Sequence, residues 1–383
     1  MGLAGLRGLL NDRVDSEGRL ATFVWQQERA FILATGQIVR RKATPAVLHL
    51  LQRSKTVNIL VTGGAGYVGS HAARLLERAG HTVWVVDNLS QGHLGAVRAG
   101  RLIEADVADR DVVVGLLREK RVEAVMHFAA LTLVGESVSD PAKYYQNNVV
   151  SSLALLESMR AAGVKRIVFS STTATYGVPE RVPITEDESQ EPINPYGFAK
   201  LVIERALADY ANAYGFAYAA LRYFNAAGAS PDGDLGEDHD PESHLIPIVL
   251  DVALGQREKI TIFGDDYPTA DGTCIRDYIH VDDLGSAHVK ALERLESGRG
   301  LCLNLGTGRG FSVREVIDTC RRVTGHAIPA EIGPRRPGDP PELVADSSRA
   351  QRQLAWKPRY TELEEIVSTA WRWHRDHPHG YAD

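Results

Sequence analysis

The feature that most constrains the fold is a glycine-rich turn between an apolar run and an amphipathic segment. VNILVT, which begins at Val57, is a short β-branched run typical of a buried parallel strand. GGAGYVG follows it, and the next segment, SHAARLLERAG, has helical periodicity. Gly63, Gly66 and Gly69 therefore stand between a strand and a helix, with the spacing of a dinucleotide-binding turn. We predict that the phosphates of a dinucleotide lie against the N terminus of this helix.

Strand-like and helix-like segments continue to alternate as far as Asn225. Further strands are predicted at 81–89, 101–107, 122–130 and 165–177. This alternation predicts an α/β fold with a doubly wound parallel sheet of the Rossmann type. After Asn225 the pattern loosens into a loop rich in glycine, proline and acids, followed by shorter segments. We predict a dinucleotide-binding domain at 57–228 and a smaller C-terminal α/β substrate lobe at 229–383.

Charge, cysteine content and hydropathy exclude several classes of protein. The net charge of −6 argues against a broad basic surface, so we predict no nucleic-acid partner. Cys274, Cys302 and Cys320 form no CxxC pair and are too few for a disulfide framework, which favours a reducing cytoplasm. No apolar run approaches the roughly 20 residues of a membrane-spanning helix, so we predict no membrane partner.

The first 56 residues differ from the rest of the chain. They carry interspersed arginines and acids and lack the apolar core of a signal peptide. We interpret residues 1–56 as a loosely structured N-terminal extension, or as translation assigned from an upstream start. We predict that this segment has no catalytic role.

Two acids end predicted strands. Asp87 closes the second strand, where a carboxylate can accept hydrogen bonds from the adenosine ribose. The same charge would repel a 2′-phosphate, so NAD is favoured over NADP. The alternative is that Asp87 caps a helix. Asp106 ends the third strand and is a candidate contact for the adenine amino group.

The stretch NPYGFAK places Tyr196 and Lys200 four residues apart. Asn194 can cap a helix and Pro195 suits its first turn, so both side chains would share one helical face. A neighbouring ammonium lowers the pKa of a tyrosine hydroxyl, which would let tyrosine act as a base. Such a tyrosine can take a proton from a sugar hydroxyl while hydride leaves the same carbon for NAD. Thr172, in the block SSTTATYG, supplies a hydroxyl in reach.

A longer series of motifs carries a family resemblance. In order, the chain contains GGAGYVGSH, VVDNLS, NNV, FSSTTATYG, NPYGFAK, RYFNAAGA, DYPTADGTCIRDYIHV, RRPGDPPELVADSSRA and the terminal HPHGYAD. This order resembles that of UDP-glucose 4-epimerases, which belong to the extended short-chain dehydrogenase/reductase group. The resemblance covers 57–383. The glycine turn and the Tyr-x-x-x-Lys pair are shared by the whole superfamily, whereas DYPTADGT, RDYIHV, RRPGD and HPHGYAD are more specific.

The resemblance implies roles for individual residues. Tyr196 is the active-site base, Lys200 holds the nicotinamide ribose and lowers the tyrosine pKa, and Thr172 hydrogen-bonds the sugar O4. Contacts with NAD are implied for Gly63, Gly66, Tyr67, Val68, Gly69, Asp87, Asn88, Asp106, Val107, Phe128, Ala129, Asn147, Tyr196, Lys200 and Tyr223. Contacts with a UDP-sugar are implied for Thr172, Tyr196, Asn225, His244, Leu245, Arg276, Arg336 and Asp339.

The implied reaction is reversible 4-epimerisation of UDP-glucose and UDP-galactose through a 4-keto sugar, in galactose metabolism. A homodimer is implied through LALLESMRAAG and VIERALADYANAY. Three departures concern cofactor binding and sugar choice. Thr132 replaces a lysine of some relatives, His244 replaces an asparagine, and Leu343 stands where some relatives limit the pocket with an aromatic residue. N-acetylated sugars and the UDP-xylose/UDP-arabinose pair therefore stay open as substrates.

Three other functions were weighed. A sugar-nucleotide 4,6-dehydratase needs an Asp-Glu pair after the active-site hydroxyl residue, where this chain has Thr173 and Ala174. A non-catalytic NAD sensor would not need to retain both Tyr196 and Lys200. GEDHDPESH and HRDHPHG contain histidines and acids, but neither has a regular ligand spacing, so we predict no metal. His127 is interpreted as a packed structural histidine.

Overall fold

The computed structural model describes the backbone at 11–14, 20–26, 29–34 and 37–40, and the chain at 56–336 and 338–382. The chain divides into two units, Met1–Lys55 and Thr56–Asp383, each described by itself. The first contains an antiparallel sheet in the order β1-β2-β3-β4, with strands Asn11–Val14, Leu20–Gln26, Arg29–Ala34 and Gln37–Arg40. We expected a loosely structured extension over 1–56. Part of it forms these strands, and the rest up to Lys55 lies outside the described residues.

A parallel seven-stranded sheet dominates the second unit. Its strands are β5 (Asn58–Thr62), β6 (Thr82–Asp87), β7 (Leu102–Glu104), β8 (Ala124–His127), β9 (Arg166–Thr172), β10 (Ala217–Tyr223) and β14 (Gly300–Leu305). They are ordered β14-β10-β9-β8-β5-β6-β7. The first six strands along the chain thus stand in the order 3-2-1-4-5-6, which is the Rossmann arrangement. The predicted doubly wound parallel sheet is confirmed.

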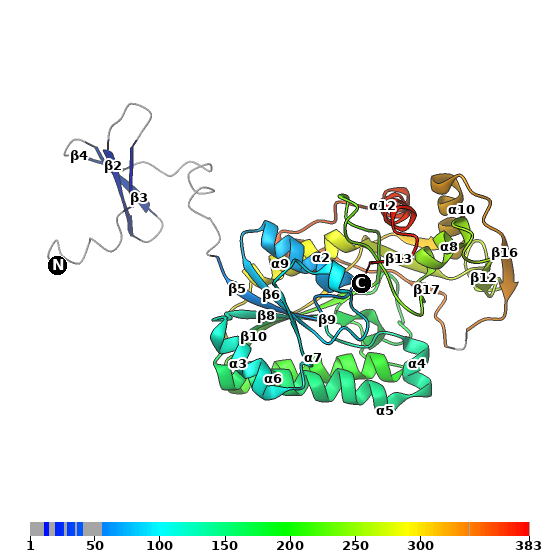
Figure 1. The fold of residues 1–383 in the computed structure, drawn as a ribbon, viewed down its shortest axis with the longest axis horizontal. Helices are drawn as coiled ribbons and strands as arrows, with labels where there is room; N and C mark the ends of the chain where they lie inside the picture. Colours follow the sequence, from blue (N-terminus) through cyan, green and yellow to red (C-terminus); the bar gives the residue numbers. More distant parts are fainter. Residues whose placement is uncertain are drawn as a thin grey trace. The chain divides into compact units, whose positions relative to one another are not determined.

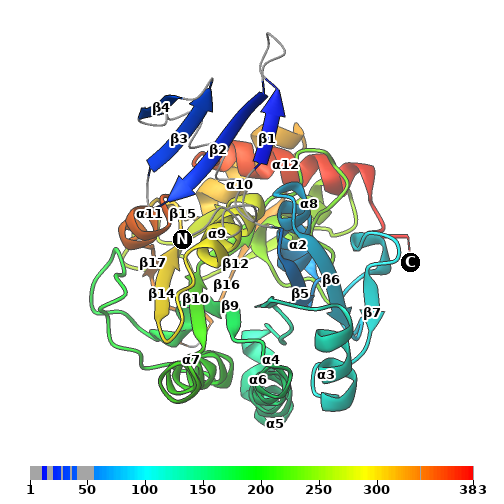
Figure 2. The same cartoon turned by 90° about the vertical axis from the view of Figure 1, so that its left-hand side faces the viewer.

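Helices cover both faces of this sheet (Figures 1 and 2). One layer contains α2 (Tyr67–Arg78) and α9 (Val281–Glu293), and the other contains α3 (Arg110–Glu119), α6 (Ser151–Ala162) and α7 (Pro195–Tyr214). Ile59 and Val61 of β5 pack in the α2 and α9 layer, whereas Leu60 packs in the opposite layer. Because both faces are covered, every residue of such a strand can be apolar.

The remaining residues after β10 form the expected smaller α/β region. Its strands are β11 (Asn225–Ala227), β12 (Ile260–Phe263), β13 (Ile275–His280), β15 (Gly310–Ser312), β16 (Ala330–Gly333) and β17 (Glu342–Leu343). Its helices α8 (Leu245–Ala253), α10 (Val313–Thr324) and α12 (Leu363–Asp376) enclose a separate apolar core. α11 (Ser348–Leu354) packs against β14 and α9.

The sheet does not end with the first 228 residues. Strand β14 pairs in parallel with β10, although it lies more than 70 residues beyond the predicted domain boundary. The predicted lobe at 229–383 therefore also supplies the seventh strand and the covering helix α9. The division into domains at residue 228 stays a prediction. Among the described helices, none combines the length and apolar character needed to span a bilayer.

Short helices border the sheet at its carboxyl edge. They are η3 (Leu94–Ala96), α4 (Val134–Ser139), α5 (Pro141–Tyr144), η4 (Tyr145–Val150) and η5 (Thr173–Thr175). The η4 segment is a π-helix that leads directly into α6. A π segment of this kind is rare and often occurs at a functional site. Asn147, one of the residues with an implied cofactor contact, lies in it.

Candidate active site

The three glycines of the turn after β5 serve different purposes. Gly63 has φ +70°, and a Cβ there would lie 2.4 Å from the backbone nitrogen of Ala129. A Cβ on Gly69 would lie 2.1 Å from the carbonyl oxygen of Gly63, so only glycine lets α2 approach the turn. A Cβ on Gly66 would meet nothing nearer than 3.5 Å. Since the protein's own packing does not require Gly66, that glycine leaves room for a ligand at the start of α2, which fits a dinucleotide phosphate.

Asp87 ties this turn to the end of β6. Its Oδ2 accepts a hydrogen bond from the backbone N–H of Ala65 at 2.9 Å, and its Oδ1 accepts one from Leu89 at 2.9 Å. Burial raises the pKa of this carboxyl, and the backbone hydrogen bonds offset only part of the rise. Each carboxylate oxygen has a second lone pair, so Asp87 can also accept from ribose hydroxyls.

Other residues with implied cofactor contacts lie along the same edge of the sheet. Phe128 and Ala129 follow β8, and both backbone N–H groups donate to the carbonyl of Thr62, at 2.9 and 3.1 Å. Asn88 donates to Asp106 at 3.2 Å, where β6 and β7 end. Tyr67 and Val68 form the first turn of α2, Val107 follows β7, and Tyr223 ends β10. Because these strands are parallel, their carboxyl ends meet in one crevice.

The structure confirms that Tyr196 and Lys200 share a helical face. Asn194 caps α7, since its side chain accepts from the N–H of Gly197 at 2.8 Å, and Pro195 occupies the first turn. Both side chains are buried, with 9% of Tyr196 and 3% of Lys200 exposed. The Lys200 Nζ lies 5.9 Å from the centre of the Tyr196 ring. Thr172, the last residue of β9, is also buried, and its hydroxyl favours the ionised form of Tyr196.

The pKa values in this pair differ from the expected direction. Burial raises the pKa of the Tyr196 hydroxyl, and the Thr172 hydroxyl offsets only part of this effect. Burial also lowers the pKa of Lys200 to about 7, while the nearby carboxylate of Glu204 raises it. In the protein alone, desolvation therefore sets the direction of the tyrosine pKa, and the expected lowering by the ammonium is not found. A bound cation next to Tyr196 would act in the direction that favours the phenolate.

Residues that sequence analysis missed hold this pair in place. Lys200 donates to the carbonyl of Ser170 at 2.8 Å, and the Ser170 hydroxyl hydrogen-bonds Tyr223 at 2.6 Å. One helical turn after Lys200, Glu204 accepts three hydrogen bonds from Arg222 of β10, at 2.9, 3.2 and 2.6 Å. Ser170 stands in the SSTTATYG block, but its contact with Tyr223 depends on the pairing of β9 with β10, which the sequence does not show.

His127 is structural, as we interpreted it. Its Nδ1 lies 2.7 Å from the hydroxyl of Thr62, and its Nε2 lies 2.8 Å from the hydroxyl of Ser152. Burial lowers its pKa to about 3, with a further contribution from Lys200, so the ring is neutral at physiological pH. Because both ring nitrogens are occupied, His127 fastens β5 and α6 to β8.

The implied substrate residues meet at the joined strands β13 and β17. Arg276 stands opposite Leu343 in the parallel pairing of these strands. Arg276 also forms an ion pair with Asp339, and both side chains are mostly buried. Arg276, and not Arg336, is the arginine paired with Asp339. The Arg336 guanidinium instead lies 4.2 Å from the ring centre of Phe263 and is exposed.

The other implied substrate residues flank this group. Asn225 begins β11, two residues after the end of β10, and stands opposite Tyr278 in the parallel pairing of β11 with β13. His244 is the N-cap residue of α8 and pairs with Glu237, and Leu245 begins that helix. Arginine, a carboxylate and a half-buried apolar residue thus lie together in the smaller α/β region. Arginine forks match diphosphate oxygens, which fits a nucleoside diphosphate.

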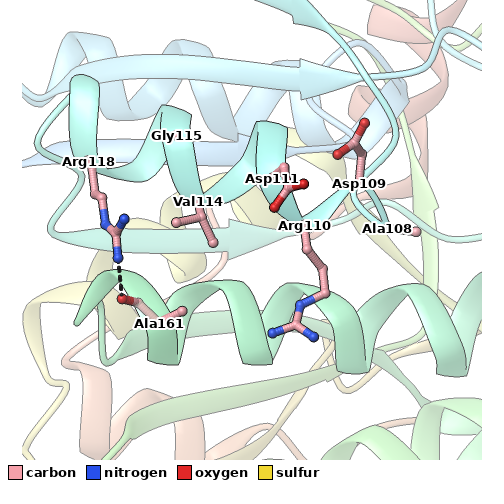
Figure 3. A pocket seen from close by; sticks show the side chains of 8 residues that line it. All are labelled: Ala108, Asp109, Arg110, Asp111, Val114, Gly115, Arg118 and Ala161. Carbon is pink, nitrogen blue, oxygen red and sulfur yellow. Dashed lines mark hydrogen bonds between the residues drawn. The ribbon is translucent and has the colours of Figure 1, made fainter.

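A hollow of about 770 Å³ lies elsewhere, between α3 and α6 (Figure 3). Arg118 of α3 donates to the carbonyl of Ala161 of α6 at 2.9 Å across it. Residues from Ala108 to Arg118 line the hollow on one side, and they include none of the predicted site residues. The hollow is therefore separate from the site of the chemistry.

Comparisons with known proteins define the class to which this fold and site belong. Residues 59–306 match the model of the NAD dependent epimerase/dehydratase family. The chain belongs to this family. NAD is accordingly its cofactor class, as the glycine turn and Asp87 predicted.

Individual relatives are more specific. A UDP-glucose 4-epimerase of Halalkalibacterium halodurans is 55% identical over 325 residues, which are 85% of this chain and 97% of that protein. A crystal structure of UDP-glucose 4-epimerase from Brucella ovis in complex with NAD is 51% identical, with a TM-score of 0.80, covering 82% of this chain and 98% of that chain. A UDP-glucose-4-epimerase from Stenotrophomonas maltophila with bound NAD and formylated UDP-arabinopyranose is 44% identical, with a TM-score of 0.81, covering 84% and 99%.

Proposed function

We propose that this protein is an isomerase that interconverts UDP-glucose and UDP-galactose by epimerisation at C4 with tightly bound NAD. The observation that carries the proposal is the buried pair of hydroxyl residues, Thr172 and Tyr196, next to Lys200 at the carboxyl edge of the dinucleotide-binding sheet. A hydroxyl pair of this kind can hold and deprotonate one sugar hydroxyl. The relatives described above, at about half identity over nearly their full length, support the same activity.

Each residue has a defined task in this proposal. Tyr196 accepts the proton of the sugar O4 hydroxyl, and Thr172 holds that oxygen in place. The bound NAD supplies a reversible hydride acceptor for C4. Lys200 keeps a positive charge near the phenol ring, and this charge favours the phenolate form of Tyr196. Arg276 and Arg336 hold the diphosphate while the 4-keto sugar rotates within the site. Hydride then returns to the opposite face of C4, and the proton returns to O4.

The rival functions lack the groups that they require. In the η5 turn, Thr173 and Ala174 follow Thr172, and Ala174 only donates its backbone N–H to the Thr172 hydroxyl at 3.2 Å. These side chains cannot supply the acid and base that a dehydratase uses across C5 and C6. Retention of Tyr196 and Lys200 in hydrogen-bonded positions also disfavours a non-catalytic sensor.

Sugar choice within the class depends on Leu343. This half-buried side chain packs against the cluster of Tyr176, Ile184, Phe224 and Ala345. Leucine is smaller than tyrosine, so UDP-N-acetylglucosamine and the UDP-xylose/UDP-arabinose pair are secondary candidate substrates. The relative solved with formylated UDP-arabinopyranose supports the pentose candidate.

We further propose that the protein acts in the cytoplasm as a homodimer. All three cysteines are free thiols, as a reducing compartment allows. Phe198 of α7 and Val150 at the start of α6 are large apolar residues that are about half exposed, at 47% each. Pairing these helices with their copies would cover both side chains. Light scattering at micromolar concentration tests the dimer, and a monomeric mass would contradict it.

A side-by-side turnover assay tests the activity. The purified chain receives UDP-galactose, UDP-N-acetylgalactosamine or UDP-xylose without added NAD, and chromatography separates the products. We expect conversion of UDP-galactose to be fastest, and the rates with the other two sugars show what Leu343 permits. Absence of conversion of all three, even after NAD is supplied, would contradict the proposed activity.

A further inference from the structure

A second cluster of titratable side chains lies in the loop between β11 and α8. It consists of Glu237, His239, Glu242 and His244, and one nitrogen or oxygen of each lies within 4.8 Å of those of the others. The Glu237 Oε1 lies 3.4 Å from the Nδ1 of His239 and also contacts the Nδ1 of His244. The Glu242 Oε2 lies 3.7 Å from the Nδ1 of His239. Two imidazoles and two carboxylates thus converge on one point.

This cluster is largely withdrawn from water. The side chains of Glu237, Glu242 and His239 are 3%, 10% and 20% exposed, and that of His244 is 46% exposed. Two carboxylates so close together need compensating positive charge, which protonated His239 and His244 or a divalent cation can supply. A divalent cation would neutralise both at once, with the imidazoles as neutral ligands.

We propose that these four side chains bind one divalent transition-metal ion of the Zn²⁺ class. With zinc–ligand bonds of about 2.0–2.2 Å, the ligand atoms of a tetrahedral site stand about 3.4 Å apart. The two separations at His239 Nδ1, 3.4 and 3.7 Å, fit this geometry, whereas Glu237 Oε1 and His244 Nδ1 are in hydrogen-bond contact and must move apart to bind one ion. Imidazole nitrogens suit zinc and its neighbours, whereas magnesium and calcium favour sites built from oxygen alone.

The surrounding structure holds the loop in shape independently of the cluster. The backbone N–H of Tyr381 donates to the Asp238 carboxylate at 2.8 Å, and the N–H of Gly236 donates to the Tyr381 hydroxyl at 3.0 Å. The C-terminal tail therefore fastens the loop on both sides of Glu237. A prearranged loop can present ligands that lack a regular sequence spacing, which is why their spacing did not predict the site.

The fold also brings together the two histidine-rich stretches of the sequence. A cavity of about 300 Å³ is lined by Glu237, His239 and Glu242 on one side and by α12 with the tail, including His377 and His379, on the other. The cavity gives an ion a polar route to the cluster.

The position of the cluster indicates a structural role for the ion. The ring of His239 meets the ring of Tyr67 edge-on, with centres 6.2 Å apart, and Tyr67 lies in the first turn of α2. His244 precedes α8 directly. One ion at this point would fix the loop between the dinucleotide turn and the first helix of the smaller α/β region. The inference does not rest on the proposed epimerase activity.

Metal content of the full chain, purified without a histidine tag from cells supplied with zinc, tests the proposal. Plasma mass spectrometry should find about one divalent ion per chain, as one four-ligand site requires. His239→Gln and Glu242→Gln should each lose most of it, with affinity for Zn²⁺ at least about tenfold weaker by calorimetric titration. His379→Gln is the matched control, because this histidine lines the same cavity outside the ligand set, and it should retain the ion.

A second measurement needs no variant, so it tests metal binding even if a variant fails to fold. Wild-type protein treated with a chelator should unfold at a lower temperature, and added Zn²⁺ should restore the midpoint. A metal-free wild type with no response to Zn²⁺ would overturn the proposal. Equal zinc uptake by Glu242→Gln and wild type would also overturn it. Either result would leave two protonated imidazoles paired with two carboxylates.

Discussion

The Lys200 Nζ lies 5.9 Å from the centre of the Tyr196 ring, one helical turn away on the same face of α7. Its hydrogen bond goes to the carbonyl of Ser170 in the neighbouring strand, at 2.8 Å. The lysine is therefore positioned by the sheet. The Tyr196 hydroxyl is left to bond a sugar oxygen in the proposed reaction.

Replacing Tyr196 by phenylalanine tests the base. Tyr196→Phe should keep its bound NAD but lose turnover by about 10²–10⁴-fold, because only the proton acceptor is removed. Steady-state rates and the NAD content of the purified variant check this. Thr172→Ser, which keeps the hydroxyl, should stay close to wild type, whereas Thr172→Val should not. Turnover of Tyr196→Phe at the wild-type rate would remove Tyr196 from the mechanism.

Two glycine-to-alanine substitutions distinguish a glycine needed for NAD binding from a glycine needed for folding. Gly66→Ala should fold with nearly unchanged stability but bind NAD weakly, because its Cβ would meet no protein atom within 3.4 Å. Gly69→Ala should lose about 1–3 kcal/mol or more of unfolding free energy, because its Cβ would strike the carbonyl oxygen of Gly63. Urea denaturation and bound-NAD content distinguish the two variants. Equal NAD content in Gly66→Ala and wild type would show that the NAD phosphates do not lie against this glycine.

Lys200 should make the stability of NAD-free protein depend on pH. Burial lowers its pKa from 10.5 to about 7, so between these values the unfolded chain binds more protons than the folded one. The destabilising contribution of Lys200 is thus fully present below pH 7 and disappears as pH rises toward 10.5. Lys200→Met should gain stability over wild type mainly at pH 6, and the gain should shrink by pH 9. Denaturation midpoints measure it, and Lys290→Met, at an exposed lysine, is the control.

The buried pair of Glu204 and Arg222 supports the catalytic helix. Arg222→Met should cost about 3–5 kcal/mol of unfolding free energy, since it leaves the Glu204 carboxylate buried without its partner. The double variant Glu204→Leu/Arg222→Met removes both charges and should lose less than Arg222→Met alone. Urea denaturation of the three proteins gives the comparison. A double variant less stable than Arg222→Met would contradict the idea of an uncompensated charge.

Local spacing in the sequence was enough to predict the glycine turn, the Tyr196–Lys200 face and the strand-end position of Asp87. Each depends on residues that are close along the chain or on one repeating βα unit. The partnership of Arg276 with Asp339 was not predictable in this way, because it joins residues 63 positions apart. The same is true of strand β14, whose place beside β10 follows only from the complete fold.

The pKa of Tyr196 shows a second limit of prediction from the sequence. The sequence places an ammonium beside the tyrosine, but it contains no direct measure of how completely the helix and sheet bury both groups. Burial decides the direction, and it raises the tyrosine pKa while lowering that of the lysine. Likewise, the residues of the 237–244 loop converge through contacts with the C-terminal tail, which their spacing does not reveal.

The central claim is that hydride leaves C4 of the sugar and returns to the same carbon within one site. It is tested most directly with UDP-galactose that carries deuterium at C4, given to the protein in ordinary water without added NAD. Mass spectrometry and NMR then locate the label in the product. We predict UDP-glucose with the deuterium still at C4. A product that carries hydrogen from water at C4 would contradict the account.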